Sequence, residues 1–178
     1  MKDKRFFRTE KAIFIAYYKL CDYPSAKKIA RHAKVSRATL YRHHKCVASI
    51  PEDHERYLVQ AYSKMIRKFL AKNSADLKQI YFRTLVFILN HDETFRVLFR
   101  DNRREAVRKM IGKLRGKVEQ RWRMAGNLDK MFNVYQNEVI GVIEAWGKQG
   151  FPAESLDTVL VDIMYLTRTA RQRLLPLK

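Results

Sequence analysis

Apolar residues recur every three or four positions along most of the chain, and this spacing constrains the fold more than any other feature of the sequence. Between Ala12 and Leu20, for example, the apolar residues fall on one face of a helix. Only four prolines and six glycines interrupt such patterns in 178 residues, and no strand-like alternation persists. The sequence therefore predicts an all-α fold.

Turn and capping residues divide the pattern into separate helices. Pro24 ends the first helix, because the residue before a proline avoids the helical region. Ser25 and Ser36 are expected N-caps of two short helices, and Pro51 begins a long one with an acidic first turn and a basic end. The expected helices cover residues 8–21, 25–33, 37–44, 51–72, 75–90, 93–100, 103–124, 128–148 and 153–174.

The charge of the chain is high and unevenly distributed. There are 37 Lys and Arg residues against 18 Asp and Glu, a net charge of +19. Residues 1–50 hold 13 basic and 3 acidic residues, whereas residues 51–178 hold 24 and 15. Such an excess indicates a polyanionic partner for the N-terminal third, the alternative being a generally basic surface.

The cysteines and the apolar runs indicate where in the cell the protein is expected. Cys21 and Cys46 form neither a disulfide framework nor a CxxC motif, which favours a reducing cytoplasm. The N-terminal residues have no apolar signal-peptide core, and the longest apolar run, residues 85–89, is too short to cross a bilayer. We expect a cytoplasmic protein without a membrane partner.

Residues 25–44 have the pattern of a helix-turn-helix: two short helices joined by a tight turn, with Ile29, Ala33, Val35 and Leu40 facing inward. A short second helix of this kind can lie in the major groove of DNA. If Leu40 marks its buried side, at about 100° per residue, the outward side carries the following residues. They are Ala38, Thr39, Tyr41, Arg42 and Lys45, with Arg37 in the first turn.

The segment SAKKIARHAKVSRATLYRHH resembles the DNA-binding head of the TetR family of bacterial one-component transcription regulators. It supplies the family's Ser or Thr, its IA pair, a turn close to A-G-V-S and a run close to T-L-Y-x-H-F. The last two long helices, with GFP between them, resemble the family more weakly. The resemblance covers almost the whole chain.

This resemblance implies base contacts from Lys27, Arg37, Ala38 and Tyr41, and phosphate contacts from several neighbours. Three residues depart from the family pattern: Lys34 replaces a turn glycine, which predicts a positive φ; His44 replaces a buried phenylalanine; and Val47 replaces a lysine. The residues that the resemblance implies and the basic residues of the outward side together give the expected DNA-binding residues. They are Ser25, Lys27, Lys28, Arg37, Ala38, Thr39, Tyr41, Arg42, His43 and Lys45.

His43, His44 and Cys46 raise the alternative of a metal site. On the helical wheel His43 is expected to face outward to the DNA backbone and His44 to pack inside, with Cys46 past the helix end. Because these side chains diverge, they do not converge as zinc ligands would, and no metal is expected. His91, Asp92 and Glu93 are interpreted as the start of a helix.

The resemblance also implies a ligand cavity in the middle of the chain. Aromatic and methionine side chains make adaptable cavity walls, and plain core packing is an equal alternative. The candidate lining residues are Tyr81, Phe82, Phe87, Phe95, Phe99, Met110 and Trp122.

The last two helices carry apolar surfaces wider than one chain of this length can cover. Two such hairpins would form a four-helix bundle across a two-fold axis, so we expect a homodimer. The candidate interface residues are Tyr135, Val139, Val142, Ile143, Trp146, Leu160, Ile163, Leu166 and Ala170.

Together these features predict a homodimeric transcription regulator, most simply a repressor that binds a pseudo-palindromic operator in double-stranded DNA and is released by a small apolar or amphipathic ligand. Residues 1–50 would form the DNA-binding domain and 51–178 the regulatory and dimerisation domain, with 51–72 as the connecting helix. No nucleophile elbow, P-loop, GxGxxG or HExxH motif is present, so neither enzymatic activity nor a cofactor is expected. Two alternatives remain: a weakly specific DNA-coating protein, and a regulator whose C-terminal domain senses a protein partner.

Overall fold

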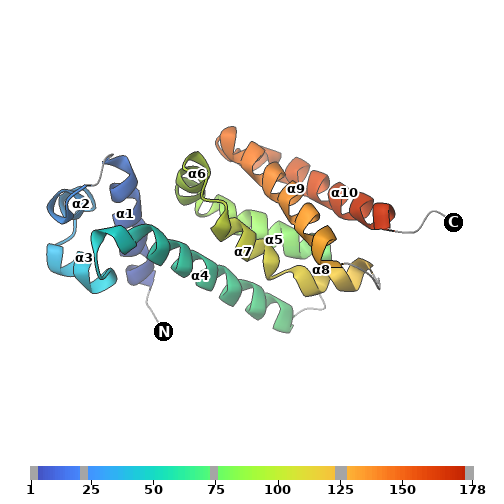
Figure 1. Ribbon diagram of the computed structural model, residues 1–178, viewed down its shortest axis with the longest axis horizontal. Coiled ribbons are helices and arrows are strands. Elements are labelled where there is room, and N and C mark those ends of the chain that lie inside the picture. The colour runs from blue at the N-terminus through green and yellow to red at the C-terminus, as the bar shows by residue number, and fades with distance from the viewer. Residues whose placement is uncertain (1–3, 21–23, 73–75, 123–127, 175–178) are drawn as a thin grey trace. The chain divides into compact units, whose positions relative to one another are not determined.

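The fold is all-α, as the apolar spacing predicts. The computed structural model describes residues 4–20, 24–72, 76–122 and 128–174, and within these ranges it has ten α-helices, two short 3-10 helices and no strand (Figure 1). Among the described helices, none combines the length and the apolar character that crossing a membrane requires.

Most helix bounds lie within a few residues of the expected ones. The helices are α1 (Lys4–Lys19), α2 (Ala26–His32), α3 (Arg37–His43), η1 (Val47–Ser49), α4 (Ile50–Lys72), α5 (Leu77–Leu89), α6 (Asp92–Arg100), α7 (Glu105–Gly112), α8 (Arg115–Trp122), α9 (Leu128–Lys148), η2 (Ala153–Ser155) and α10 (Leu156–Leu174).

The single helix expected over residues 103–124 is wrong, because the chain forms α7 and α8 with a break between them. Lys113 caps α7 at its C-terminus, and its backbone N–H bonds to carbonyl groups of the last turn. Gly112 and Gly116 flank the break, and each glycine costs about 1 kcal/mol relative to alanine inside a helix.

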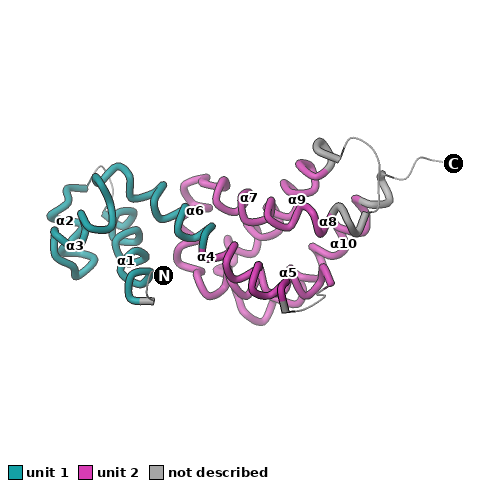
Figure 2. Tube along the Cα trace, turned by 90° about the horizontal axis from the view of Figure 1, so that it is seen from below, with its two compact units in different colours: residues 1–60 teal, residues 61–178 magenta. Residues whose placement is uncertain are grey.

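The chain divides into two compact units, residues 1–60 and 61–178, which Figure 2 distinguishes by colour. The boundary lies inside α4, ten residues after the one expected from the sequence. In unit 1, α2 packs against both α1 and α3. Its core contains the fully buried side chains of Ile13, Phe14, Ile29, Leu40 and Leu58. Leu58 lies in the third turn of α4, so the start of that helix packs within unit 1.

In unit 2, α10 packs against α5 and α9, and α9 also contacts α6 and α7. A chain of buried hydroxyl groups crosses this core. The Tyr81 and Tyr135 hydroxyls lie 2.6 Å apart, and the Tyr135 hydroxyl is 2.7 Å from that of Thr167. Thr167 in turn donates to the carbonyl of Ile163 at 2.8 Å. Burial raises the pKa of Tyr135 to about 12 and that of Tyr81 well above its usual value, so both hydroxyls stay protonated.

Candidate nucleic-acid interface

Hydrogen bonds from residues within the α2–turn–α3 segment fix where its two helices begin. Ser25 accepts a hydrogen bond from the backbone N–H of Lys28, and Ser36 accepts one from that of Thr39 at 2.9 Å. Both predicted N-caps are confirmed. Between them, Lys34 has φ +55°, which confirms the positive φ predicted at this position. The turn is closed by a hydrogen bond of 2.9 Å from the N–H of Val35 to the carbonyl of Ala30.

Eight of the ten candidate DNA-binding residues are exposed, and Thr39 is half-buried. Tyr41 is 47% exposed, although its neighbour Leu40 is fully buried. Arg42 donates to the Thr39 hydroxyl, which also accepts from the hydroxyl of Ser36. Arg31 and Lys34 are further exposed cations that the sequence analysis did not select, although they lie on the same helix and turn.

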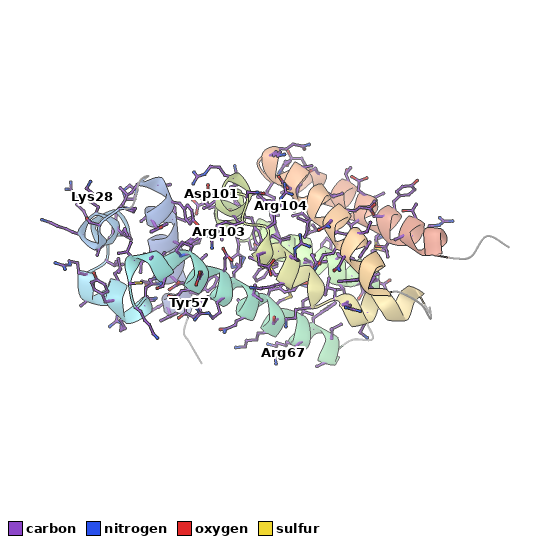
Figure 3. All side chains as sticks on the ribbon, viewed as in Figure 1. Lys28, Tyr57, Arg67, Asp101, Arg103 and Arg104 are labelled. Carbon is purple, nitrogen blue, oxygen red and sulfur yellow. The ribbon has the colours of Figure 1, made fainter. Side chains whose placement is uncertain are left out.

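The exposed cations of this segment are available to a ligand. None of them pairs with a carboxylate within the described part of the chain. Lys28 extends from α2 into solvent in Figure 3. Arg42 keeps four of its five donors beyond its contact with Thr39. The exposed cations are Lys27, Lys28, Arg31, Lys34, Arg37, Arg42 and Lys45.

The outward orientation expected for His43 is wrong. His43 is 8% exposed, and its Nδ1 lies 2.9 Å from Oε2 of Glu10 on α1. Its ring stacks on that of Phe6, with the ring centroids 4.0 Å apart. The α1 helix covers this side of α3, so His43 holds α3 in place and is not placed to contact a phosphate directly.

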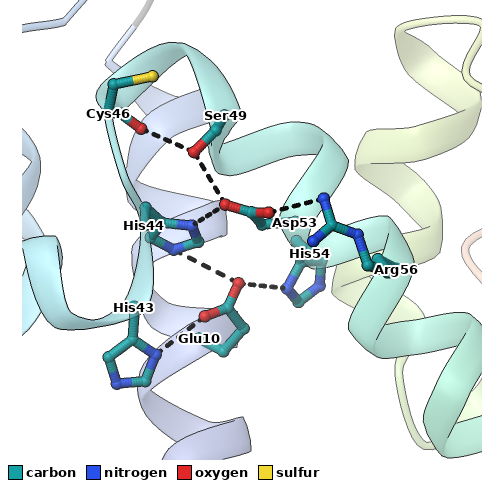
Figure 4. A network of polar contacts seen from close by, with 8 residues as sticks. All are labelled: Glu10, His43, His44, Cys46, Ser49, Asp53, His54 and Arg56. Atoms are coloured by element: carbon teal, nitrogen blue, oxygen red, sulfur yellow. Dashed lines mark hydrogen bonds and ion pairs between the residues drawn. The ribbon is translucent and has the colours of Figure 1, made fainter.

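His44 is buried, as predicted, within a polar cluster that the sequence did not indicate (Figure 4). Its Nδ1 lies 3.1 Å from Oδ2 of Asp53, and its Nε2 lies 3.4 Å from Oε1 of Glu10. Burial lowers the pKa of His44, although the hydrogen bond with Asp53 and the Asp53 charge oppose this.

Asp53 is held by further partners at the start of α4. Ser49 donates to its Oδ2 at 2.8 Å, and Arg56 Nη2 lies 2.9 Å from its Oδ1. Burial alone would raise the pKa of Asp53, but the hydrogen bonds from Ser49 and His44 and the Arg56 charge outweigh it, so the pKa is lowered. This carboxylate is therefore compensated by its own neighbours.

No three His, Cys, Asp or Glu side chains of the described residues are arranged to hold a metal ion. Cys46 lies after the end of α3 and is exposed. The two histidines that the sequence places beside it point into the cluster instead.

The candidate ligand-pocket residues lie mostly in the packed core of unit 2. Tyr81, Phe87, Phe95 and Met110 are buried and Phe99 is half-buried, so their part in a ligand cavity stays a prediction. The Trp122 side chain lies outside the described ones. An open groove of about 430 Å³ does occur in this unit, and of the candidates only Phe82 is found among its described lining residues. Its other lining residues are Phe69, Asp76, Lys78, Gln79, Arg83, Asp157 and Leu160.

The candidate dimer-interface residues are also largely covered by their own chain, which corrects the prediction. Trp146, for example, donates from Nε1 to the carbonyl of Pro152 at 3.1 Å and is 2% exposed. Val142 and Leu166 are half-buried. The buried members are Tyr135, Val139, Ile143, Trp146, Leu160, Ile163 and Ala170.

The large exposed apolar residues of the hairpin are different ones. Val134 on α9 is 55% exposed, and Val161 and Tyr165 on α10 are 64% and 65% exposed. The described part of the hairpin therefore exposes apolar side chains, but most of the predicted interface residues are buried in the core, where α9 packs against α6 and α7 and α10 packs against α5.

Comparisons with protein-family models, with curated proteins and with solved structures found no match to this chain.

Proposed function

We propose that this protein is a DNA-binding transcription regulator, with α2 and α3 as a helix-turn-helix and α3 as the recognition helix. The observation that carries the proposal is the row of exposed cations without carboxylate partners along α2 and α3. Helix α3 also presents Ala38, Tyr41 and Arg42, a set that offers an apolar contact and a guanidinium to base edges. The resemblance of residues 25–44 to the TetR family supports the same interpretation.

The regulator acts as a homodimer in this proposal. Val134 on α9 and Val161 and Tyr165 on α10 are exposed apolar residues of the hairpin, and Val142 and Leu166 are half-buried. Figure 1 shows α9 and α10 side by side, and the two helices pack on each other. Pairing these exposed residues with their symmetry mates would bury them and give the two recognition helices a fixed spacing.

Regulation by a ligand is the second part of the proposal. The groove in unit 2 combines the rings of Phe69 and Phe82 with the guanidinium of Arg83, which lies 5.3 Å from the Phe69 ring centroid. Such a lining suits a small amphipathic molecule with an anionic group. A ligand that binds more tightly to a dimer with wrongly spaced heads lowers the affinity for DNA. Bound DNA lowers the affinity for the ligand by the same factor.

Selecting bound duplexes from a random DNA pool tests the proposal. A dimer of recognition helices should select a pseudo-palindrome with half-sites about one turn of DNA apart, 34–36 Å, or a whole multiple of it. Moving one half-site by half a turn should abolish tight binding, because the second site then lies on the opposite face of the duplex. A pool without a shared motif would contradict sequence-specific regulation.

Arg42→Ala tests the reading of bases by α3. Its expected cost is about 1–3 kcal/mol on the selected operator, with relaxed preference at one position. Equal losses on selected and random DNA would remove Arg42 from base reading.

Weakly specific coating of DNA is the second candidate, favoured by the charge of unit 2. Residues 96–117 contain nine Lys or Arg and two Asp or Glu, and Lys109, Lys113 and Lys117 are exposed. The ratio of specific to non-specific affinity at one salt concentration separates the two, because a regulator exceeds about 10³ and a coating protein stays near unity.

A further inference from the structure

The polar cluster of unit 1 joins three segments that are distant in the sequence. Glu10 on α1 is fully buried, and its carboxylate faces His43 at the end of α3, His44 just after it and His54 on α4. The distance from Oε1 to Nδ1 of His54 is 3.9 Å. Figure 4 shows the three imidazoles arranged around this one carboxylate. One buried acid thus meets both residues that end the proposed recognition helix.

We propose that Glu10 is a positioning residue for α3, that the buried histidines around it make the docking of α3 against α1 and α4 depend on proton binding, so that acid releases the recognition helix, and that the Glu10 carboxylate limits this release by holding one proton in the docked state. This inference rests on the proposed DNA binding for its biological consequence, but not for the proton linkage itself.

The charges of the cluster limit the number of protons that it can hold when docked, because Glu10 and the three histidines are buried. Glu10 and Asp53 each bring one negative charge, and Arg56 already faces Asp53. Glu10 can therefore neutralise one imidazolium, and His43, whose nitrogen is the nearest at 2.9 Å, is placed to carry it. A second or third proton would leave a buried charge without a counter-charge, which is costly.

The surroundings of the other two histidines agree with this count. The His44 side chain is fully buried, and its lowered pKa reflects that burial. The His54 ring is fully buried and stacks on Phe14, with the centroids 4.0 Å apart. The charged and titratable groups that face the cluster come from α1, α3 and its cap, and α4. They are Glu10, His43, His44, Asp53, His54 and Arg56.

Docking of α3 therefore competes with protonation of the three histidines, which are open to water once α3 is released. Three histidines in water, each with a pKa of about 6.5, bind nearly three protons at pH 5.5, whereas the docked cluster binds one. Stability falls with falling pH wherever the released state binds more protons. Counting one docked proton, the docking constant of the wild type should fall about 20-fold between pH 7.0 and 5.5.

Two variants change this slope in opposite directions. Glu10→Gln keeps the shape of the side chain but removes the counter-charge, so the docked state binds no proton. The docking constant should then fall about 500-fold between pH 7.0 and 5.5. His44→Phe removes one of the titrating groups, so the docking constant should fall only about twofold between the same pH values. A residue with a merely structural role would lower the docking constant equally at both pH values.

Hydrogen exchange of the whole chain of 178 residues measures the docking constant without DNA. The amide of Leu40, bonded to the carbonyl of Ser36, reports on α3, and amides of α5 in unit 2 serve as an internal reference. His32→Gln is the matched control, because His32 is an exposed histidine on α2 and the exchange slope should not change. Equal slopes in the wild type, Glu10→Gln and His44→Phe would overturn the proposal.

Binding of the selected duplex at constant ionic strength is the second arm. The pH at which binding is half lost should be highest for Glu10→Gln, lower for the wild type and lowest for His44→Phe. If the three proteins lose half of their DNA binding at the same pH while their exchange slopes differ, docking of α3 does not limit DNA binding. This result would overturn the proposed effect of docking on DNA binding. If no duplex binds at pH 7.0 while the exchange slopes separate as expected, the proposed function fails and the positioning role of Glu10 stands.

Discussion

Replacing Lys27, Lys28 and Lys45 of unit 1 by glutamine should reduce the salt dependence of DNA binding by a predictable amount. Five of the exposed cations of the head are candidate DNA-binding residues, namely Lys27, Lys28, Arg37, Arg42 and Lys45, and no described carboxylate neutralises them. If four or five per head meet phosphates, the dimer should show a slope of log K against log salt of about −7 to −9, from about −0.9 per contact. Exchanging the three lysines removes six contacts from the dimer, so the slope should fall to about −2 to −4.

A labelled operator titrated at several salt concentrations gives both slopes by fluorescence anisotropy. The triple exchange of Lys109, Lys113 and Lys117 by glutamine is the matched control, because these lysines are exposed on unit 2 and the same number of charges is lost there. For a regulator its slope should equal that of the wild type, whereas a coating protein would lose slope with either exchange. A wild-type slope near −2, or a unit 1 triple variant with an unchanged slope, would refute the assignment of this face to DNA.

Four further substitutions test the packing. Ile29→Ala empties a fully buried position in unit 1 and should cost about 2–5 kcal/mol in urea denaturation, so a loss below 1 kcal/mol would contradict its core role. Trp146→Glu should lower the melting temperature of unit 2, because it buries a carboxylate; a stably folded monomer would instead restore the interface role that the sequence suggested. Val161→Glu should leave the fold intact and give monomers in sedimentation, and a persistent dimer would exclude the outer face of α10. Lys34→Gly should stabilise unit 1 by about 0.5–1 kcal/mol in thermal unfolding, because glycine adopts φ +55° without the penalty of a side chain; a destabilisation would mean that chain entropy outweighs that relief.

Local chemistry made the α2–α3 segment predictable. Ser25 and Ser36 cap helices through contacts three residues away, so their role is contained in the sequence around them. The positive φ of Lys34 follows in the same way from its place in the turn. The burial of Leu40 and the exposure of Tyr41 and Arg42 follow from helical periodicity.

The two errors about helix faces share one cause, which is contact with distant segments. A helical wheel orders residues around an axis, but it does not say which neighbour covers each side. His43 lies on the side that α1 covers, and its partner Glu10 is 33 residues away in the sequence. Trp146 lies on the covered side of its hairpin, while Val161 and Tyr165 remain open to solvent.

The sequence alone determined the all-α class, the caps and turn of the α2–α3 segment, and the basic character of unit 1, because propensity, periodicity and charge act over a few residues. Only the tertiary structure decided that Glu10 meets three imidazoles in the interior and which apolar side chains of the α9–α10 hairpin stay exposed. Both depend on the packing of helices that are far apart in the chain, where burial can place a charged side chain among partners that no local pattern reveals.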